Sequence, residues 1–284
     1  MMNRQMVAMA TLALVAGVSA YACASRSGNA PQSPPLPPDA GGALARLNAS
    51  PRHGEYQMIR TGPNDSVRVW VVYPERATRA PVVLVVHEIY GLSNWVRSVA
   101  DQLAADGFIA IAPDLVTSKN VPSDSLGDPD RTAVTAAIRT LNVSTVQRQL
   151  GEIAKWGMAR PSATQKYGIV GFCWGGGASF DHAISAPDLD ASVVYYGSPS
   201  LKDLAAVKAP ILGLYGGTDA RIGATIPVAD SAMKALGKTY EPHSFAGAGH
   251  GFARQQTGQN GANDAAIKEA WPLTVNWFRK YLGK

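Results

Sequence analysis

The sequence predicts an α/β protein with a mostly parallel central sheet covered by helices on both faces. Short apolar runs rich in β-branched residues recur along the chain, as expected for strands that are buried on both faces. Segments with helical spacing of apolar residues lie between these runs, and strands that alternate with helices favour a parallel sheet. Of the 284 residues, 46% are hydrophobic, which is enough for a large core.

The regular elements are expected from about residue 55 onward, without an internal repeat. Residues 55–60 and 67–73 predict a hairpin, because the turn-forming run Gly62-Pro63-Asn64-Asp65 separates them. Further strands are expected at 81–86, 108–112, 167–170, 191–196, 211–215 and 239–245. Helices are expected at 93–106, at 131–156 with an interruption near Asn142, from near Gly175 to 185, at 228–236 and at 265–282.

The first 44 residues predict export. An uncharged apolar run at 6–20 follows the positive charge of Arg4, which is typical of a signal peptide and too short to span a bilayer. Residues 25–42 are rich in Pro, Ser and Gly and predict an extended tether. We therefore divide the chain into a signal peptide at 1–22, a tether at 23–44 and one folded domain at 45–284.

Two processing routes remain open for this exported chain. Val18-Ser19-Ala20 matches the small-x-small pattern for cleavage before Tyr21. Alternatively, Ala20-Tyr21-Ala22-Cys23 resembles a bacterial lipobox, in which a lipid on Cys23 would attach the protein to a membrane. The expected location is the periplasm or the membrane surface as a lipoprotein. The only other cysteine is Cys173, so no structural disulfide is expected.

The charge pattern excludes one class of partner. The net charge is only +5, and no run of five or more like charges occurs. Nucleic-acid binding needs a concentrated basic surface. We therefore expect a small-molecule partner and no nucleic acid.

A glycine-rich motif carries the first candidate catalytic residue. Gly171-Phe172-Cys173-Trp174-Gly175-Gly176-Gly177 lies between the strand predicted at 167–170 and the helix that begins near Gly175. This is the G-x-nucleophile-x-G pattern of a sharp strand-to-helix turn, with Cys in place of the usual Ser. The helix N-terminus is expected to lower the pKa of the Cys173 thiol. The alternative is an inert buried cysteine in a tight turn.

Two later segments supply an acid and a base. Asp219 follows the strand at 211–215, and His250 follows the strand at 239–245 in a glycine-rich loop. Taken singly, Asp219 could be a helix N-cap and His250 an ordinary loop residue. The chain order nucleophile, acid, histidine and the position of each residue just after a strand predict a Cys173-His250-Asp219 catalytic triad.

The loop Val86-His87-Glu88-Ile89-Tyr90-Gly91-Leu92 follows the buried strand at 81–86. In such an arrangement this loop supplies one backbone N–H to the oxyanion hole, and the residue after the nucleophile supplies the other. We assign these donors to Ile89 and Trp174. Glu88 is expected to face the nucleophile, whereas the alternative is that His87 and Glu88 form a surface polar pair.

Together these motifs resemble the dienelactone hydrolase family over about residues 55–284. The resemblance also rests on Pro113-Asp114-Leu115, Gly216-Gly217-Thr218-Asp219 and Gly249-His250-Gly251-Phe252-Ala253-Arg254. It implies an α/β-hydrolase fold, a Cys-His-Asp triad and no cofactor, and we assign no metal ligand. It further implies that Glu88 contacts the resting thiol and swings away when substrate binds, leaving a thiolate paired with His250.

The resemblance also implies a role for Arg254, four residues after His250, in gripping a substrate carboxylate. The alternative is an ordinary surface arginine. Dienelactone enzymes use a second arginine after the fourth strand, and here both Arg131 and Arg139 lie in that region. Tyr90 is expected to line the substrate pocket, with Trp95, Trp174 and Phe252, although such aromatic residues often belong to the core.

The predicted function is therefore hydrolysis of an ester or lactone, with an anionic substrate as one option. Cys173 attacks the carbonyl to form a thioester, and His250 protonates the leaving alcohol and then activates water. Two alternatives remain. One is a thioesterase or acyltransferase on the same fold, and the other is a non-catalytic tethered binding protein.

Overall fold

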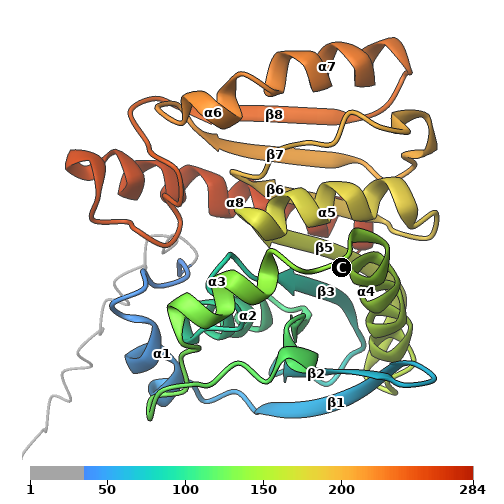
Figure 1. Ribbon diagram of the computed structural model, residues 1–284, viewed down its shortest axis with the longest axis vertical. Coiled ribbons are helices and arrows are strands. Elements are labelled where there is room, and N and C mark those ends of the chain that lie inside the picture. The colour runs from blue at the N-terminus through green and yellow to red at the C-terminus, as the bar shows by residue number, and fades with distance from the viewer. Residues whose placement is uncertain (1–34, 284) are drawn as a thin grey trace, which may run out of the picture. The chain divides into compact units, whose positions relative to one another are not determined.

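An eight-stranded sheet forms the centre of residues 35–283, the part of the chain that the computed structural model describes (Figure 1). Its strand order is β1-β2-β4-β3-β5-β6-β7-β8. The first two neighbouring pairs, β1 with β2 and β2 with β4, are antiparallel, and the remaining pairs are parallel. The strands are β1 Gly54–Gly62, β2 Asp65–Val72, β3 Ala80–Val86, β4 Ile109–Asp114, β5 Ala163–Phe172, β6 Ala191–Tyr195, β7 Ile211–Gly216 and β8 Tyr240–Phe245. The predicted mostly parallel sheet is confirmed.

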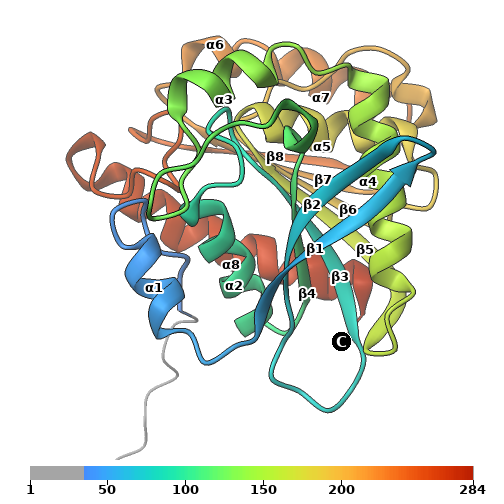
Figure 2. The same ribbon diagram turned by 60° about the horizontal axis from the view of Figure 1, so that its bottom comes forward.

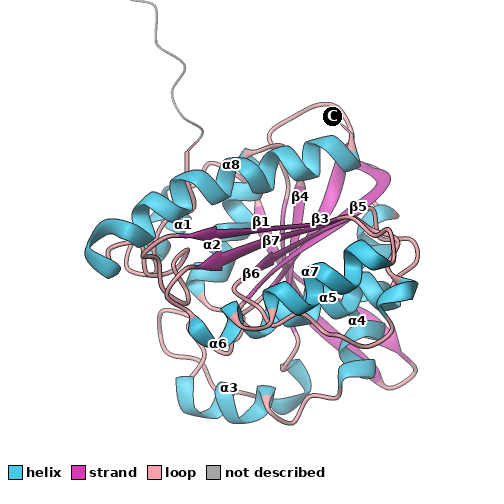
Figure 3. Cartoon of the chain, turned by 90° about the horizontal axis from the view of Figure 1, so that it is seen from above, coloured by secondary structure: helices cyan, strands magenta, loops and turns pink. Residues whose placement is uncertain are grey.

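Helices cover both faces of this sheet, as predicted. One face packs against α4 (Val143–Met158), α5 (Trp174–Ser185) and α7 (Ile226–Ala235). The opposite face packs against α2 (Asn94–Ala105) and α8 (Ala262–Leu282), and α1 (Ala43–Ala49) packs on α2. Figure 2 shows α1 and α2 across the sheet from α4, and Figure 3 shows α8 across the sheet from α5. The shorter helices are α3 (Arg131–Ile138) and α6 (Ala220–Gly223).

Side-chain caps explain where several predicted helices begin. Ser93 accepts a hydrogen bond from the backbone N–H of Val96 and starts α2. Asn142 accepts one from the N–H of Thr145 and starts α4. The predicted helix at 131–156 is therefore two helices that meet near Asn142, where the sequence indicated an interruption.

The folded part begins earlier than residue 45, the predicted boundary between tether and domain. The indole Nε1 of Trp95 donates to the carbonyl oxygen of Pro38 at 3.0 Å, and the N–H of Ala40 donates to the carbonyl of Arg254 at 3.0 Å. Leu36 packs against the core on the face of the sheet that α2 and α8 cover. A proline-rich segment cannot form its own core, but here it packs on the core of the domain. We call residues 35–42 the N-terminal strap.

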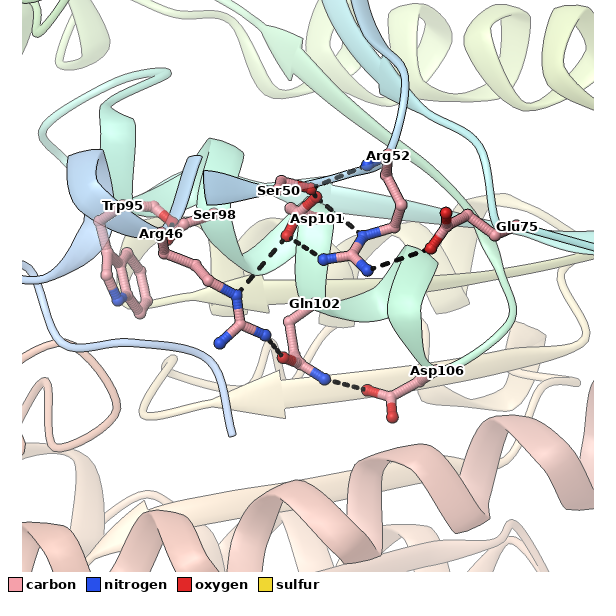
Figure 4. A network of polar contacts seen from close by, with 9 residues as sticks. All are labelled: Arg46, Ser50, Arg52, Glu75, Trp95, Ser98, Asp101, Gln102 and Asp106. Carbon is pink, nitrogen blue, oxygen red and sulfur yellow. Dashed lines mark hydrogen bonds and ion pairs between the residues drawn. The ribbon is translucent and has the colours of Figure 1, made fainter. Parts of the chain in front are cut away.

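The strap is continuous with α1, which a buried carboxylate holds against α2 (Figure 4). Asp101 of α2 has a side chain only 2% exposed. It accepts bonds from the Arg52 guanidinium at 2.9 and 2.7 Å and from the Ser50 hydroxyl at 2.5 Å, and Arg46 lies 3.8 Å away. Multiple partners offset the cost of burying this charge. These contacts fix the chain that leads from the strap into β1.

The predicted signal peptide, Cys23 and the tether before residue 35 lie outside the described residues. Within residues 35–283, none of the helices combines the length and the apolar character needed to cross a bilayer.

Candidate active site

Cys173 lies on a strained turn between β5 and α5. Its backbone has φ 56° and ψ −115°, a region that a residue with a side chain rarely adopts. The turn is tight because strand and helix meet without side chains between them. A Cβ on Gly171 would lie 1.9 Å from the carbonyl oxygen of Gly175, and a Cβ on Gly175 would lie 2.4 Å from that of His87. The sequence predicted this turn from the same glycines.

The three predicted triad residues come together at the carboxyl ends of β5, β7 and β8. His250 Nε2 lies 3.1 Å from Cys173 Sγ, and His250 Nδ1 lies 2.5 Å from Asp219 Oδ2. Asp219 has a second task, because its other oxygen accepts a bond from the N–H of Ile222 at 3.3 Å and caps α6. The two interpretations of Asp219, cap and partner of His250, therefore hold at once.

The pKa of the Cys173 thiol is raised, mainly by burial and next by the charge of Glu88. The net direction is opposite to the prediction, because burial and the charge of Glu88 outweigh the lowering of this pKa by the N–H at the start of α5. The N–H groups of Trp174 and Ile89 do face the sulfur and act to lower the pKa. These are the two predicted oxyanion donors, and the structure places both beside Cys173.

Glu88 is buried, with 3% of its surface exposed, and its neighbour His87 is 0% exposed. The alternative of a surface polar pair is therefore wrong. Glu88 Oε2 forms an ion pair with Arg254 Nε at 2.8 Å. Burial raises the pKa of Glu88 to about 7, against the opposing effect of Arg254. The family resemblance implied that Glu88 contacts the resting thiol. In this structure the thiol instead lies against His250, and Glu88 is paired with Arg254.

Two arginines stack on Tyr90, two residues after Glu88 in the loop that follows β3. The guanidinium carbons of Arg131 and Arg254 lie 4.5 and 4.7 Å from the centre of the Tyr90 ring. The Arg254 side chain is only 12% exposed, so the surface-arginine alternative is wrong. Both arginines and Tyr90 line a cavity of about 570 Å³, together with Ala40 of the N-terminal strap. Arg139, the other candidate, is exposed at the end of α3.

The remaining aromatic residues divide between pocket and core. Trp95 borders the same cavity but also packs on Phe172 in the core, and the lining of this cavity includes none of the three triad residues, so its place in the substrate pocket stays a prediction. Phe252 is fully buried among core residues, which corrects its assignment to the pocket. Trp174 stacks on the imidazole of His87, with ring centres 5.5 Å apart.

Tyr196 was not singled out from the sequence, yet it borders the predicted triad. Its ring lies 5.1 Å from that of His250, and its hydroxyl is close enough to Glu88 to help lower the pKa of that carboxyl. Tyr196 follows β6, the strand beside β5, so its position next to the nucleophile strand was the available signal. Among residues 35–283, no group of three or more His, Cys, Asp or Glu is arranged to hold a metal ion.

The raised pKa of Glu88 predicts a pH-dependent stability. Its ordinary value is 4.5 and its folded value is about 7, so the folded protein retains a proton that the unfolded chain releases in between. This contribution is complete below pH 4.5 and disappears as pH rises through 7. Between pH 5 and 8 the wild type should lose roughly 2–3 kcal/mol of unfolding free energy relative to Glu88→Gln. Urea unfolding of both proteins at the two pH values measures this difference, and parallel pH dependences would contradict it.

An elbow thiol beside a histidine at the carboxyl edge of a mostly parallel sheet is the arrangement of the α/β-hydrolase class. The chain belongs to the dienelactone hydrolase family, which matches residues 67–282. The resemblance found in the sequence is thereby confirmed, as is the prediction that the chain is a hydrolase acting on carboxylic ester bonds.

Individual proteins of known sequence or structure are similar to this chain. A Salmonella typhimurium protein named "Putative carboxymethylenebutenolidase" is 30% identical over 276 residues, covering 91% of this chain and 97% of that protein. A Klebsiella pneumoniae crystal structure described as "Putative Dienelactone Hydrolase" has TM-score 0.71 and 27% identity, covering 81% of this chain and 99% of that one. The Pyrococcus horikoshii acylaminoacyl peptidase, 16% identical with TM-score 0.65 over 86% of this chain and 44% of its own, shows the fold alone.

Proposed function

We propose that this protein hydrolyses an ester or lactone through a thioester on Cys173. The observation that carries the proposal is the alignment of Cys173 Sγ, His250 and Asp219 through contacts of 3.1 and 2.5 Å. A binding protein has no need of this alignment on a strained elbow, which argues against the non-catalytic alternative.

In the proposed reaction the Cys173 sulfur attacks the carbonyl carbon, and the developing oxyanion accepts bonds from the N–H groups of Ile89 and Trp174. His250 carries the proton to the leaving alcohol, whose C–O bond breaks to leave the thioester. His250 then takes a proton from water, which attacks the thioester and releases the acid and the thiol. Asp219 keeps the Nδ1 of His250 protonated, so that Nε2 faces the sulfur.

Glu88 would link binding to activation of the thiol. Its negative charge raises the pKa of Cys173, and it forms an ion pair with Arg254, which also lines the cavity beside Tyr90. A substrate carboxylate that pairs with Arg254 would compete with Glu88 for that guanidinium. With a pKa of about 7, Glu88 can then take up a proton near neutral pH, which removes its unfavourable effect on the thiolate.

The paired arginines favour an anionic substrate, and Arg131 offers the cleaner test because Arg254 is directly paired with Glu88, whereas the charge of Arg131 has a smaller effect on the pKa of that carboxyl. Arg131→Gln should reduce kcat/KM for a carboxylated lactone about 10–100-fold relative to its uncharged methyl ester, since a hydrogen bond to a charged group contributes roughly 1.5–3 kcal/mol. The exposed Arg139→Gln is the matched control and should leave that ratio unchanged. Equal ratios in both variants would refute the arginine pair as a carboxylate site.

The reaction class is tested by comparing matched acyl groups as oxygen esters, lactones and thioesters, with and without an added alcohol acceptor. We expect the highest kcat/KM for oxygen esters or lactones and free acid as the product. A preference for thioesters, or transfer of the acyl group to the alcohol, would favour the thioesterase or acyltransferase alternative.

We propose, from residues 1–44 alone, that the chain is exported to the periplasm and held there either free or by a lipid on Cys23. The apolar run at 6–20 and the Pro/Ser/Gly-rich segment after it support this location. Mass spectrometry of the mature N-terminus from fractionated bacterial cells distinguishes the routes. Cleavage before Tyr21 indicates a free protein, a diacylglyceryl Cys23 indicates an anchored one, and an intact Met1 in the cytoplasm contradicts export.

A further inference from the structure

We propose that His87 is a positioning residue that orients the oxyanion donor of Ile89. The inference rests on the proposed function, because it assigns a means of holding one of the two N–H groups that the thioester mechanism uses. His87 follows β3 and is completely buried, yet no step of the proposed reaction involves its imidazole.

The imidazole bonds to the peptide group that supplies the donor. His87 Nδ1 lies 2.8 Å from the carbonyl oxygen of Glu88. That carbonyl and the N–H of Ile89 belong to one planar peptide unit, so fixing the oxygen fixes the direction of the N–H. The N–H of Gly91 donates to the same oxygen at 3.2 Å, and the Thr135 hydroxyl donates to the carbonyl of Ile89 at 3.2 Å. The donor peptide is thus restrained on both sides.

The tautomer of His87 follows from its second bond. The N–H of Leu115 donates to His87 Nε2 at 3.3 Å, so Nε2 is an acceptor without a proton. Burial lowers the pKa of His87, which favours the neutral ring. Nδ1 therefore carries the proton and donates it to the Glu88 carbonyl. A hydrogen bond donated to the Glu88 carbonyl polarises that peptide group. The N–H of Ile89 in the same peptide group thereby becomes a better hydrogen-bond donor.

The same ring also contacts the residue of the second donor. The indole of Trp174 stacks on the His87 imidazole with ring centres 5.5 Å apart and planes inclined by 17°. The backbone of His87 lies so close to Gly175 that a Cβ there would be 2.4 Å from the His87 carbonyl oxygen. One buried side chain thus connects the loop that bears Ile89 to the elbow that bears Trp174.

Two variants separate the two hydrogen bonds. In His87→Asn the side-chain amide lies near the site of Nδ1 and can still donate to the Glu88 carbonyl. In His87→Gln the amide reaches the site of Nε2 instead, which leaves the Glu88 carbonyl without a side-chain donor. His87→Gln should acylate with 4-nitrophenyl acetate at least tenfold more slowly, which is less than the ~10²–10³-fold cost of losing an oxyanion donor outright. His87→Asn should stay within about fivefold of the wild type.

The control is alkylation of Cys173 by iodoacetamide, which uses the thiolate and His250 but forms no oxyanion. Its rate should change less than about threefold in both variants, because the N–H of Ile89 has only a small effect on the thiol. Equal losses of acylation and alkylation in His87→Gln, or unchanged acylation, would overturn the proposal. If His87→Gln does not fold, a His87→Asn protein with normal alkylation and tenfold slower acylation would also overturn it. If the proposed function itself is wrong, the result differs: the wild-type protein would still be acylated after Cys173 has been alkylated.

Discussion

Replacement of Cys173 by Ala is expected to reduce ester hydrolysis by about 10⁴-fold or more, because the variant retains the oxyanion donors but has no nucleophile. The same variant should lose the rapid reaction with iodoacetamide. The full chain also contains Cys23, so the label is located by peptide mass spectrometry, and its loss from the peptide that carries Cys173 reports on this side chain.

Folding should survive this change, since Cys173 is only partly buried and Ala removes a single atom beyond Cβ. The melting temperature should therefore stay within a few degrees of the wild-type value. A Cys173→Ala protein that folds and still hydrolyses 4-nitrophenyl acetate at the wild-type rate would refute Cys173 as the nucleophile.

Asp219→Asn is expected to lower kcat by about 10³–10⁴-fold with little effect on stability. The amide still accepts the bond from the N–H of Ile222 that caps α6, so the helix start is preserved. The amide carries no negative charge at the site 2.5 Å from His250 Nδ1. The imidazole is then no longer held in the tautomer with a proton on Nδ1, and its protonated form is less stabilised during the reaction.

Asp219→Ala provides the matched comparison, because it removes both the carboxylate and the cap. It should lose as much activity as Asp219→Asn and in addition about 1 kcal/mol of unfolding free energy. An Asp219→Asn protein with near wild-type kcat would show that the carboxylate only caps α6.

The sequence predicted the sheet and the positions of Cys173, Asp219 and His250 for one physical reason. Each residue lies at most a few residues after a strand of the parallel part of the sheet, and the carboxyl ends of parallel strands meet at one edge of the sheet. Ile89 could be placed by the same logic, because its loop follows β3 beside β5. Local pattern and topology were sufficient for these positions.

Features that depend on side-chain direction and burial could not be predicted. Arg131 begins the short helix α3 and Arg139 follows its last residue, and only the packing shows that Arg131 reaches Tyr90. The direction of the thiol pKa shift depends on burial and on the approach of Glu88, which no spacing reveals. The N-terminal strap docks through carbonyl groups of its prolines, whereas composition indicated only an inability to form a core.

The most direct test of the proposed mechanism is to trap the acyl group during turnover. Rapid acid quenching after mixing with 4-nitrophenyl acetate, followed by intact-protein and peptide mass spectrometry, should show one acetyl group on the peptide that carries Cys173. The adduct should form and decay at rates consistent with kcat, and it should be absent in Cys173→Ala. An acetyl group on a serine or histidine instead, or turnover without any adduct on Cys173 under these conditions, would contradict the thioester mechanism.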